Sequence, residues 1–568
     1  MNLLSVFARL NIAACIGHRQ PASHRNHVDI GSIACHVAAL IGCVFVPALH
    51  ADEPLSTKSQ QPHIVMAFAD DWGCYASAYA KRFPNSPSEV IHTPNFDKIA
   101  GDGVLFANAF VSAPSCTPCR SSLLSGQPFW RCEKSSILQG AIWDFSLPAY
   151  PLLLEESGYR IGQTYKVWSP GQPVDAPHGG KRTEFESAGR RFNAFSQVAM
   201  KAKNHKVGKQ QLLDEVRRNI RSFLDADDDR KLDSKQPICY WFGPTNTHRK
   251  WVAGSGKALW GIDPDDLKGK LPSYLPDVPV VREDFADYLG EAMAFDAALG
   301  VLDEELRRVG IADETLLVVS GDHGVPGVSR GKCNLYDFGT HVPLAIRWPD
   351  GIPHPGRLVE DFVSLPSLAT TFLSVADVEI PESMIAKPIV DILVDSRSGQ
   401  IDPERDAAIT GRERHVAKAR GGYLPYPQRA IQTKDWLYII NFEPERTPMG
   451  DGPILQSDWE VPNKDALTNN TFAAYGDLDA SPTKAFIVLN RDQYPDAFDA
   501  AVGRRPKFEM YYLANDPDCT TNLAENPDWE TERQRLHRRL MTHLETTGDP
   551  RVSDDVIFES GDYVKPTR

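Results

Sequence analysis

Two short, uninterrupted apolar runs constrain the fold of this chain more than any other feature of its sequence. Residues 64–68 (Ile-Val-Met-Ala-Phe) lead to the pair Asp70-Asp71, and residues 316–320 (Leu-Leu-Val-Val-Ser) lead to Asp322-His323. Runs without polar alternation are typical of strands that a parallel sheet buries on both faces. Ligands of such sheets bind beyond the carboxyl ends of the strands, so we expect the two acidic clusters to meet at one sheet edge.

Helix and strand candidates alternate around these runs. Strand candidates at 159–164 and 238–242 lead to Lys166 and His248. The helix candidates lie at 95–102, 121–125 and 283–308. This alternation predicts an α/β domain over residues 60–395.

The pattern changes after about residue 395. Strand-like pieces at 436–441 and 511–513, followed by a helix near 529–546, predict a smaller α+β domain over residues 396–560. Within the first domain, a polar, Lys-rich stretch at 200–235 predicts an exposed helix. The Pro- and Asp-rich residues 255–282 predict a surface loop that could reach over the site.

Composition limits the classes of partner. A chain of 568 residues with 42% hydrophobic and 24% charged residues is typical of a soluble globular protein with more than one domain. Its formal net charge of −14 disfavours nucleic acid as a partner. An anionic substrate therefore has to be met by a local group of Lys and Arg side chains.

Residues 1–51 predict an export signal, and with it a secreted or periplasmic protein. Three arginines precede an apolar stretch at 31–49 that is followed by acidic residues. A membrane anchor is the alternative, but the stretch contains His36 and Pro47 and is short for a bilayer span. Leu-Ile-Gly-Cys43 also fits a lipoprotein cleavage site, which would tether the protein to a membrane through Cys43.

Seven of the ten cysteines follow the export segment, and the sequence leaves their pairing open. None has metal-type spacing. Cys116 and Cys119 share Cys-x-x-Cys spacing, which leaves a thioredoxin-like redox pair as an alternative, although the short βαβ context of that motif is missing.

The segment around Cys116 combines a thiol, a helix start and a cation. Pro118 suits the first position of a helix, and Gly126 suits the residue just past its end. Free backbone N–H groups at a helix N-terminus favour an anion, and Arg120 can donate to sulfate or phosphate oxygens. A buried cysteine beside a solvated arginine is the alternative.

A hard divalent cation requires several oxygen ligands, which the predicted strand ends can supply. Asp70, Asp71 and Asp322 offer carboxylates, with His323 beside them. Nitrogen is a poor ligand for calcium, so His323 leaves magnesium and manganese open beside it. The sequence shows no ligand set for a second metal.

The segment Cys116-Thr-Pro-Cys-Arg120 resembles the Cys-x-Pro-x-Arg signature of the type I, formylglycine-dependent sulfatases. The resemblance implies an alkaline-phosphatase-like α/β fold: a large, mixed, mostly parallel sheet flanked by helices, with a smaller C-terminal α+β domain. It also implies that a formylglycine-generating enzyme converts Cys116 to formylglycine. The modified residue would then join Asp70-Asp71 and Asp322-His323 around Ca²⁺.

The same resemblance assigns roles to further residues. Arg120 belongs to the signature, Lys166 and Lys332 would hold the sulfate oxygens, and His248 would protonate the departing atom. A hydroxyl of the hydrated aldehyde at residue 116 would attack sulfur, and the second hydroxyl would then eliminate sulfate.

Longer segments resemble the sulfamidase group, which comprises the heparan N-sulfatases or N-sulfoglucosamine sulfohydrolases. They include YPLLLEESGYR from residue 150, GKCNLYDFGTHVPLAIRWP from 331 and FEMYYLANDPDCTTNLAENP from 508. By this resemblance Arg414 and His415 would contact the sugar. Where the sulfamidase pattern has Lys-x-His, this chain has Lys166, Val167 and Trp168. The indole of Trp168 would stack on a sugar ring instead.

These residues predict an exported enzyme that hydrolyses sulfate from a sulfated carbohydrate, with a sulfamidase as the preferred interpretation. An O-sulfatase acting on another sulfated glycan and a phosphomonoester or phosphonate hydrolase of the same superfamily remain as enzymatic alternatives. A non-catalytic binder of sulfated glycans is the alternative from another class, but a binder needs no nucleophile.

Overall fold

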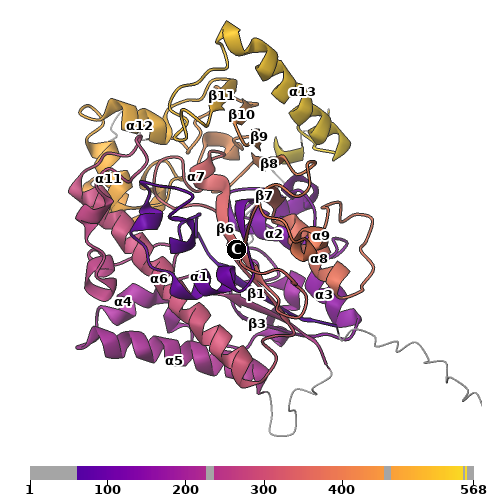
Figure 1. Cartoon of the computed structure of the whole chain (residues 1–568). Helices are drawn as coiled ribbons and strands as arrows, with labels where there is room; N and C mark the ends of the chain where they lie inside the picture. Colours follow the sequence, from indigo (N-terminus) through magenta and orange to yellow (C-terminus); the bar gives the residue numbers. More distant parts are fainter. Residues whose placement is uncertain (1–60, 226–235, 453–461, 554–556, 560–568) are drawn as a thin grey trace, which may run out of the picture. The chain divides into compact units, whose positions relative to one another are not determined.

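A seven-stranded sheet forms the centre of the computed structural model (Figure 1). The strand order is β3-β4-β1-β5-β6-β2-β7. Its strands are β1 (His63–Ala69), β2 (Val104–Phe110), β3 (Arg160–Tyr165), β4 (Ile238–Gly243), β5 (Thr315–Gly321), β6 (His341–Arg347) and β7 (Arg357–Ser364). Neighbouring strands are parallel except at β6, which is antiparallel to both β5 and β2. The predicted mixed, mostly parallel sheet is therefore confirmed.

The structure describes residues 61–225, 236–452, 462–553 and 557–559. The expected export signal at 1–51, including Cys43, lies outside these residues. The described residues pack as one compact unit, so the domain boundary placed at residue 395 stays a prediction. No helix in the described part of the chain is long and apolar enough to cross a membrane.

Strand β1 is buried on both faces, as its uninterrupted apolar run predicts. Ile64, Met66 and Phe68 pack into one hydrophobic core, and the alternating Val65 and Ala67 pack into another. Every residue of β1 and β5 is buried. Both faces therefore need a layer of helices.

Two groups of helices supply these layers. One core contains residues of α1 (Pro94–Gly101), α4 (Phe195–Ala199), α5 (His205–Leu224) and α6 (Pro279–Arg308). The other contains residues of α2 (Cys116–Ser125), α3 (Tyr150–Glu156), α8 (Pro366–Val375), α9 (Val390–Val394) and α13 (Glu530–Thr546). Helices α5 and α6 pack against each other along one side of the sheet (Figure 1).

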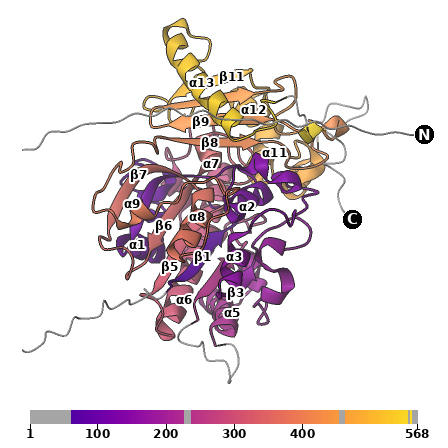
Figure 2. The same ribbon diagram turned by 90° about the vertical axis from the view of Figure 1, so that its right-hand side faces the viewer.

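A second, antiparallel sheet follows in the C-terminal part, in the order β11-β10-β9-β8. Its strands are β8 (Ala407–Arg412), β9 (Gln428–Thr433), β10 (Trp436–Asn441) and β11 (Phe508–Tyr512). Helix α13 packs against β9 and β10 (Figure 2). The remaining helices are α7 (Asp337–Thr340), α10 (Lys464–Asn469), α11 (Pro482–Leu489) and α12 (Pro495–Val502). This arrangement confirms the smaller α+β part.

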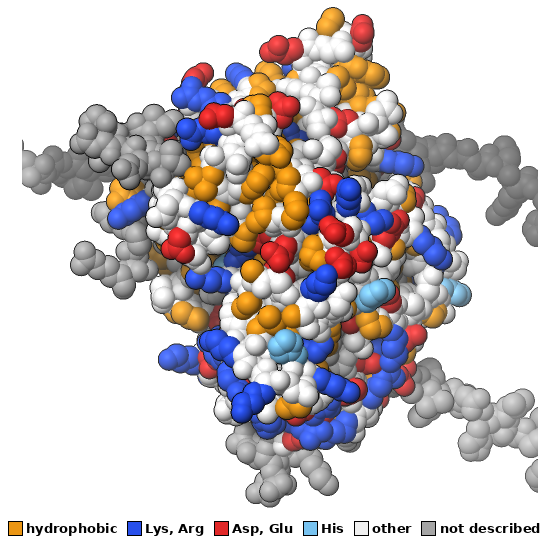
Figure 3. All heavy atoms as spheres, turned by 90° about the vertical axis from the view of Figure 1, so that its left-hand side faces the viewer, with side chains coloured by type: hydrophobic (Ala, Val, Ile, Leu, Met, Phe, Trp, Pro, Cys, Tyr) orange, Lys and Arg blue, Asp and Glu red, His pale blue; other side chains and the backbone are white. Residues whose placement is uncertain are grey.

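Two local predictions differ from the structure in detail. The polar helix α5 buries one face through Leu212, Val216 and Ile220, while Lys and Arg side chains gather on the surface over its other face (Figure 3). Residues 255–282 contain two short helical turns, Gly256–Trp260 and Pro264–Leu267, which pack against α6.

Candidate active site

Sheet register brings the two acidic clusters together. Ala69 at the end of β1 pairs with Gly321 at the end of β5, so the residues that follow leave the sheet side by side. The backbone N–H of Asp71 donates to Oδ1 of Asp322 at 2.7 Å. Asp71 itself adopts a left-handed backbone conformation with φ of 57°, which turns the chain sharply after the strand. The expected meeting of these clusters at one sheet edge is confirmed.

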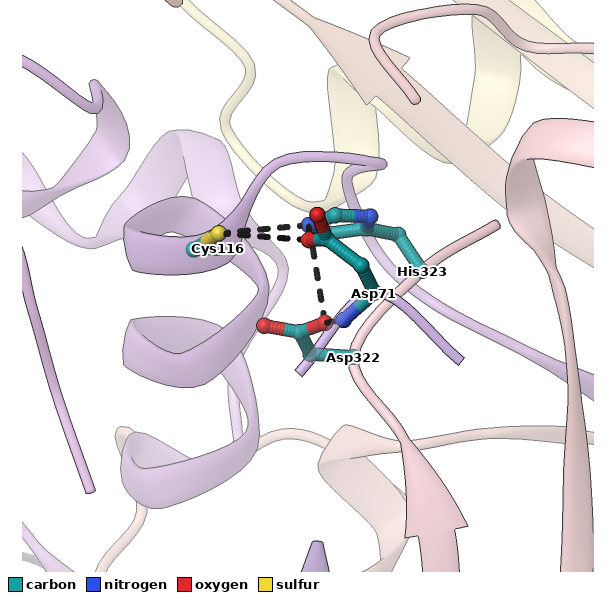
Figure 4. A group of neighbouring side chains, drawn as sticks. All are labelled: Asp71, Cys116, Asp322 and His323. Atoms are coloured by element: carbon teal, nitrogen blue, oxygen red, sulfur yellow. Dashed lines mark hydrogen bonds and ion pairs between the residues drawn. The ribbon is translucent and has the colours of Figure 1, made fainter. Parts of the chain in front are cut away.

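Cys116 is the first residue of helix α2 and faces these clusters (Figure 4). Its Sγ lies 3.3 Å from Nε2 of His323 and 3.8 Å from Oδ1 of Asp71. Burial raises the pKa of the thiol well above its usual range. The helix begins two residues before Pro118 and ends at Gly126, whose φ of 62° is the left-handed cap that the sequence predicts.

Four donors from three parts of the chain form a group that fits a divalent cation. Ligand atoms of Asp71, Cys116, Asp322 and His323 all lie within 4.8 Å of one another. Nδ1 of His323 is 3.1 Å from the carbonyl oxygen of Gly324; when it donates there, Nε2 directs its lone pair at the carboxylates. Nε2 is 3.1 Å from Oδ1 of Asp71 and 3.5 Å from Oδ1 of Asp322. A cation between these electron pairs would relieve their repulsion.

A second group of possible ligands consists of Asp70, Asp71 and His248. It shares Asp71 with the first group, and the sequence did not reveal it. Nζ of Lys166 lies 2.6 Å from Oδ1 of Asp70, so an ammonium group already neutralises this corner of the site. The arrangement therefore favours one metal ion with lysines around it.

Two lysines flank the carboxylates. Nζ of Lys332 lies 3.1 and 3.2 Å from the two carboxylate oxygens of Asp71. Burial would lower the pKa of Lys332, but the charges of Asp479 and Asp71 outweigh it and hold the pKa well above its usual range. For the acid Asp70 the directions are reversed. Burial would raise its pKa, but Lys166 and other nearby cations keep the pKa well below its usual range. Lysines and carboxylates thus stabilise each other's charged forms.

His248 is oriented by its own loop. Its Nδ1 lies 2.6 Å from the carbonyl oxygen of Arg249, which leaves Nε2 on the side of Asp71, at 3.9 Å from Oδ2. Arg249 in turn forms a bidentate pair with Asp284 at 2.8 and 2.9 Å. With 39% of its side chain exposed, His248 can reach a bound substrate.

A cavity of about 480 Å³ opens above these groups. Cys116, Lys166, His248, Lys332 and His415 all line it, so an anionic group that enters this cavity would lie near two lysines and Cys116. Its volume is typical of a site for a small molecule. Residues 255–282 do not line it, so the expectation that this loop covers the site was wrong.

Comparison with known proteins agrees with this geometry. The profile of the family described as Sulfatase matches residues 62–378. The chain belongs to the sulfatase family. The N-sulphoglucosamine sulphohydrolase of Homo sapiens is 26% identical over 527 residues, which cover 88% of this chain and 94% of the relative. An ulvan-active sulfatase of Formosa agariphila is 23% identical over 520 residues, which cover 88% of this chain and 82% of the relative.

A solved structure, described as a complex with its substrate D-glucosamine-2-N,6-O-disulfate, shares the fold of this sulfatase. It aligns with a TM-score of 0.56 at 16% sequence identity, over 87% of this chain and 99% of that chain. Family, relatives and fold together identify the chain as a sulfuric ester hydrolase with the alkaline-phosphatase-like fold.

Arg120 of this sulfatase lies beneath the site rather than in its cavity. Its Nε donates to Asp322 at 2.8 Å, its Nη2 donates to Asp70 at 3.1 Å, and its Nη1 donates to the carbonyl oxygens of Lys166 and Val167. The side chain is fully buried. The expectation that it donates directly to the substrate anion was wrong, because carboxylates and carbonyls occupy its donors. Arg120 holds two strand ends and the start of the Lys166 loop together.

The three predicted substrate contacts have different outcomes. His415 lines the cavity, where its Nδ1 is 2.8 Å from Oγ of Ser115, and burial lowers its pKa to about 3, so it is neutral. The indole of Trp168 is fully buried and donates to Oγ of Ser121, so it presents no face to a sugar. Arg414 is also buried and donates to the carbonyl oxygen of Phe558, outside the cavity lining.

Sequence reasoning missed the contribution of the C-terminal part to the cavity wall. Asp479 lines the cavity and its Oδ2 lies 3.4 Å from Nζ of Lys332. Gln139 and the segment from Asn469 to Phe472 line it as well. No local motif marks these positions, because only the packing of distant segments brings them to the site.

Proposed function

We propose that this sulfatase removes sulfate from a sulfated carbohydrate, and that the nitrogen-linked sulfate of glucosamine is its preferred target. One observation carries the proposal: Lys166, Lys332 and His248 converge on the cavity that ends at Cys116. A tetrahedral anion placed there meets two ammonium groups and one possible proton donor. The human relative, named for N-sulphoglucosamine, supports the choice of the sugar.

In this proposal a formylglycine-generating enzyme converts Cys116 to formylglycine, which supplies the attacking hydroxyl. Asp70, Asp71, Asp322 and His323, with the modified residue, would hold a divalent cation, Ca²⁺ or alternatively Mg²⁺ or Mn²⁺. When bound, the cation would polarise the nucleophile and offset negative charge. The buried acidic group described above supports this role through its mix of oxygen and nitrogen donors.

The chain's own residues would bind and orient the substrate. Lys166 and Lys332 would donate to the sulfate oxygens and offset the charge that grows as the bond to the leaving group breaks. His248, with Nδ1 held by the Arg249 carbonyl, would present Nε2 and its proton to the departing nitrogen or oxygen. Arg120 would keep Asp70 and Asp322 in place.

An O-sulfatase is the second candidate, because the site lacks the polar residue that the sulfamidase pattern has at position 168. Burial of Trp168 removes that contact without adding a stacking surface. The ulvan-active relative also shows that chains similar to this one act on other sulfated glycans. We further propose that residues 1–51 export the protein, in keeping with an extracellular glycan as the substrate.

The proposal is tested by expressing the chain with a formylglycine-generating enzyme. The mass of the peptide that contains residue 116 is measured, and sulfate release is assayed with N-sulfoglucosamine, O-sulfated sugars and a phosphomonoester. We expect the aldehyde mass and cleavage of N-sulfoglucosamine. Cys116→Ala should abolish turnover, and Cys119→Ala, which alters the other thiol of α2 outside the cavity, should retain it.

Other outcomes are equally informative. Cleavage of O-sulfated sugars alone would move the assignment to an O-sulfatase, and preference for the phosphomonoester would favour a phosphohydrolase. An aldehyde at residue 116 with no hydrolysis of any substrate would refute the proposal.

A further inference from the structure

A second cavity adjoins the catalytic cavity of this sulfatase. It has a volume of about 510 Å³ and shares three lining residues, Gln139, Val416 and Phe472, with the catalytic cavity. Each cavity falls in the range typical of sites for small molecules. A ligand that fills the first can therefore continue into the second past these shared residues.

Phe472 stands between the two cavities with 64% of its surface exposed. Single exposed apolar residues are common and need no explanation by themselves. This ring, however, lines both cavities, so a ligand that spans the two would contact it. Aromatic faces stack well against the apolar face of a sugar ring, which leaves the sugar hydroxyls free for polar contacts.

The segment that carries Phe472 is held in place before any ligand binds. The buried ammonium group of Lys484 donates to the carbonyl oxygens of Thr471, Tyr475 and Leu478 at 3.2, 3.3 and 2.6 Å. The backbone N–H of Phe472 also donates to Oδ1 of Asn470 at 3.0 Å. Because the segment is already ordered, binding does not have to order a loop.

The second cavity has a cationic side as well. Lys418 is exposed in its wall, and no residue of the described chain forms an ion pair with it. Asp451 lines the same cavity, but its oxygens accept from the backbone N–H of Gly421 at 2.7 Å and from Oγ1 of Thr447 at 2.8 Å. These donors orient the carboxylate of Asp451 toward Gly421 and Thr447, so Lys418 is the lining residue of this cavity that can pair with an anionic sugar.

We propose that the second cavity binds the neighbouring sugar of an oligosaccharide, stacked on Phe472, with its carboxylate or sulfate group at Lys418. The sulfated sugar occupies the catalytic cavity, so the substrate is an anionic oligosaccharide and not a free monosaccharide. This inference rests on the proposed function for the identity of the first sugar. The second subsite itself rests on the shared wall, the exposed ring and the lysine.

The test measures binding to the Cys116→Ala variant, which the proposed function expects to bind substrate without turning it over. The probes are N-sulfoglucosamine alone, its disaccharide with glucuronic acid, its disaccharide with a sulfated hexose, and its disaccharide with glucose. We expect both anionic disaccharides to bind about tenfold more tightly than the monosaccharide, a difference of about 1.4 kcal/mol. Adding Phe472→Ala should abolish this gain, so that in that variant the anionic disaccharides bind no more tightly than the monosaccharide does.

Two further variants control the measurement. Phe145→Ala removes another exposed aromatic ring, which lines neither cavity, and should change nothing. Lys418→Gln should weaken binding of the anionic disaccharides but not of the glucose disaccharide, whereas Lys418→Arg should bind the anionic disaccharides as the parent protein does. A larger effect of Lys418→Gln on the glucuronic acid disaccharide would identify a carboxylate as the recognised group, and a larger effect on the sulfated hexose disaccharide would identify a sulfate.

Three results would overturn the inference: equal affinity for monosaccharide and disaccharides, no difference between Phe472→Ala and Phe145→Ala, or no binding of any probe. Its failure is separable from that of the proposed function. Matured wild-type protein that binds the disaccharide through Phe472 but releases no sulfate would contradict the hydrolase proposal alone. Sulfate release from the monosaccharide without a Phe472 effect would contradict the second subsite alone.

Discussion

Asp477 anchors the backbone at Val416, a residue that lines both cavities, and its replacement gives a sharp prediction. Its Oδ2 accepts from Arg412 Nη2 at 2.6 Å and from Arg420 Nη1 at 2.8 Å, and its Oδ1 accepts from the backbone N–H of Val416 at 2.8 Å. The side chains of Asp477, Arg412 and Arg420 are 0%, 2% and 3% exposed. Burial would raise the pKa of Asp477, but Arg420 and Arg412 hold it below its usual range, so it is charged at neutral pH.

Asp477→Asn preserves shape and removes one charge, which leaves two buried guanidinium groups without their shared carboxylate. Breaking a buried ion pair from one side typically costs about 3–5 kcal/mol, and an isosteric change adds no cavity. We therefore expect the free energy of opening of the segment around Val416 to fall by about 3 kcal/mol or more. Because this segment lines both cavities, disaccharide affinity should fall with it.

Hydrogen exchange measures this local effect, since a chain of this size is not expected to unfold in a single two-state transition. Exchange in the peptide spanning Arg412 to Arg420 should accelerate on the order of 100-fold in Asp477→Asn. Asp492→Asn is the matched control, because its side chain is 99% exposed and its ion pair is 3.9 Å long. A loss below about 1 kcal/mol, the range of an exposed pair, would refute the reasoning.

Three further predictions concern catalysis and pH. His248→Asn should lower kcat for a sulfated sugar by about 10²–10⁴-fold but have little effect on 4-nitrophenyl sulfate, whose leaving group needs no proton; equal losses with both substrates would contradict a general acid. Asp479→Asn removes a counter-charge 3.4 Å from Lys332 and should lower kcat/KM about 10–100-fold, whereas Asp479→Glu should recover part of it. Burial raises the pKa of Glu291 on α6 to about 7, so the folded state holds this proton more tightly than the unfolded state. The resulting stabilisation is complete below about pH 4.5 and is lost as pH rises through 7. The free energy of opening of the α6 segment around Glu291, measured by hydrogen exchange corrected for its intrinsic pH dependence, should therefore fall by about 1–3 kcal/mol from pH 5 to pH 8 in the wild type, and by less in Glu291→Gln. An identical pH dependence in both proteins would argue against this assignment.

Much of the candidate site follows from local sequence patterns. The apolar runs of β1 and β5 end at Asp70-Asp71 and Asp322-His323, and parallel strands place such ends at one edge. Lys166 and His248 follow β3 and β4 in the same way. The end of α2 at its Gly126 cap also follows from local backbone preferences, whereas the helix begins two residues before Pro118, the first position that the sequence favours.

Side-chain partners were harder to predict. Arg120 and Trp168 have the right positions in the chain for substrate contacts. In the folded protein, however, the guanidinium group of Arg120 donates to Asp322 and Asp70, and the side chain of Trp168 packs in the hydrophobic core. Strands β2, β6 and β7 also went unnoticed in the sequence, although they complete the sheet. The pairing of β2 with β6 and β7 joins residues more than 200 positions apart, which no local pattern encodes.

The sequence by itself determined the fold class, the sulfatase resemblance and the strand-end residues, because apolar periodicity, helix caps and strand ends depend on near neighbours in the chain. Only the tertiary structure decided which Lys and Arg side chains line the cavity and which lie beneath the carboxylates. It also decided that residues near 472 and 479 complete the cavity. These outcomes depend on burial and on charge pairs between distant segments, which arise only when the chain packs.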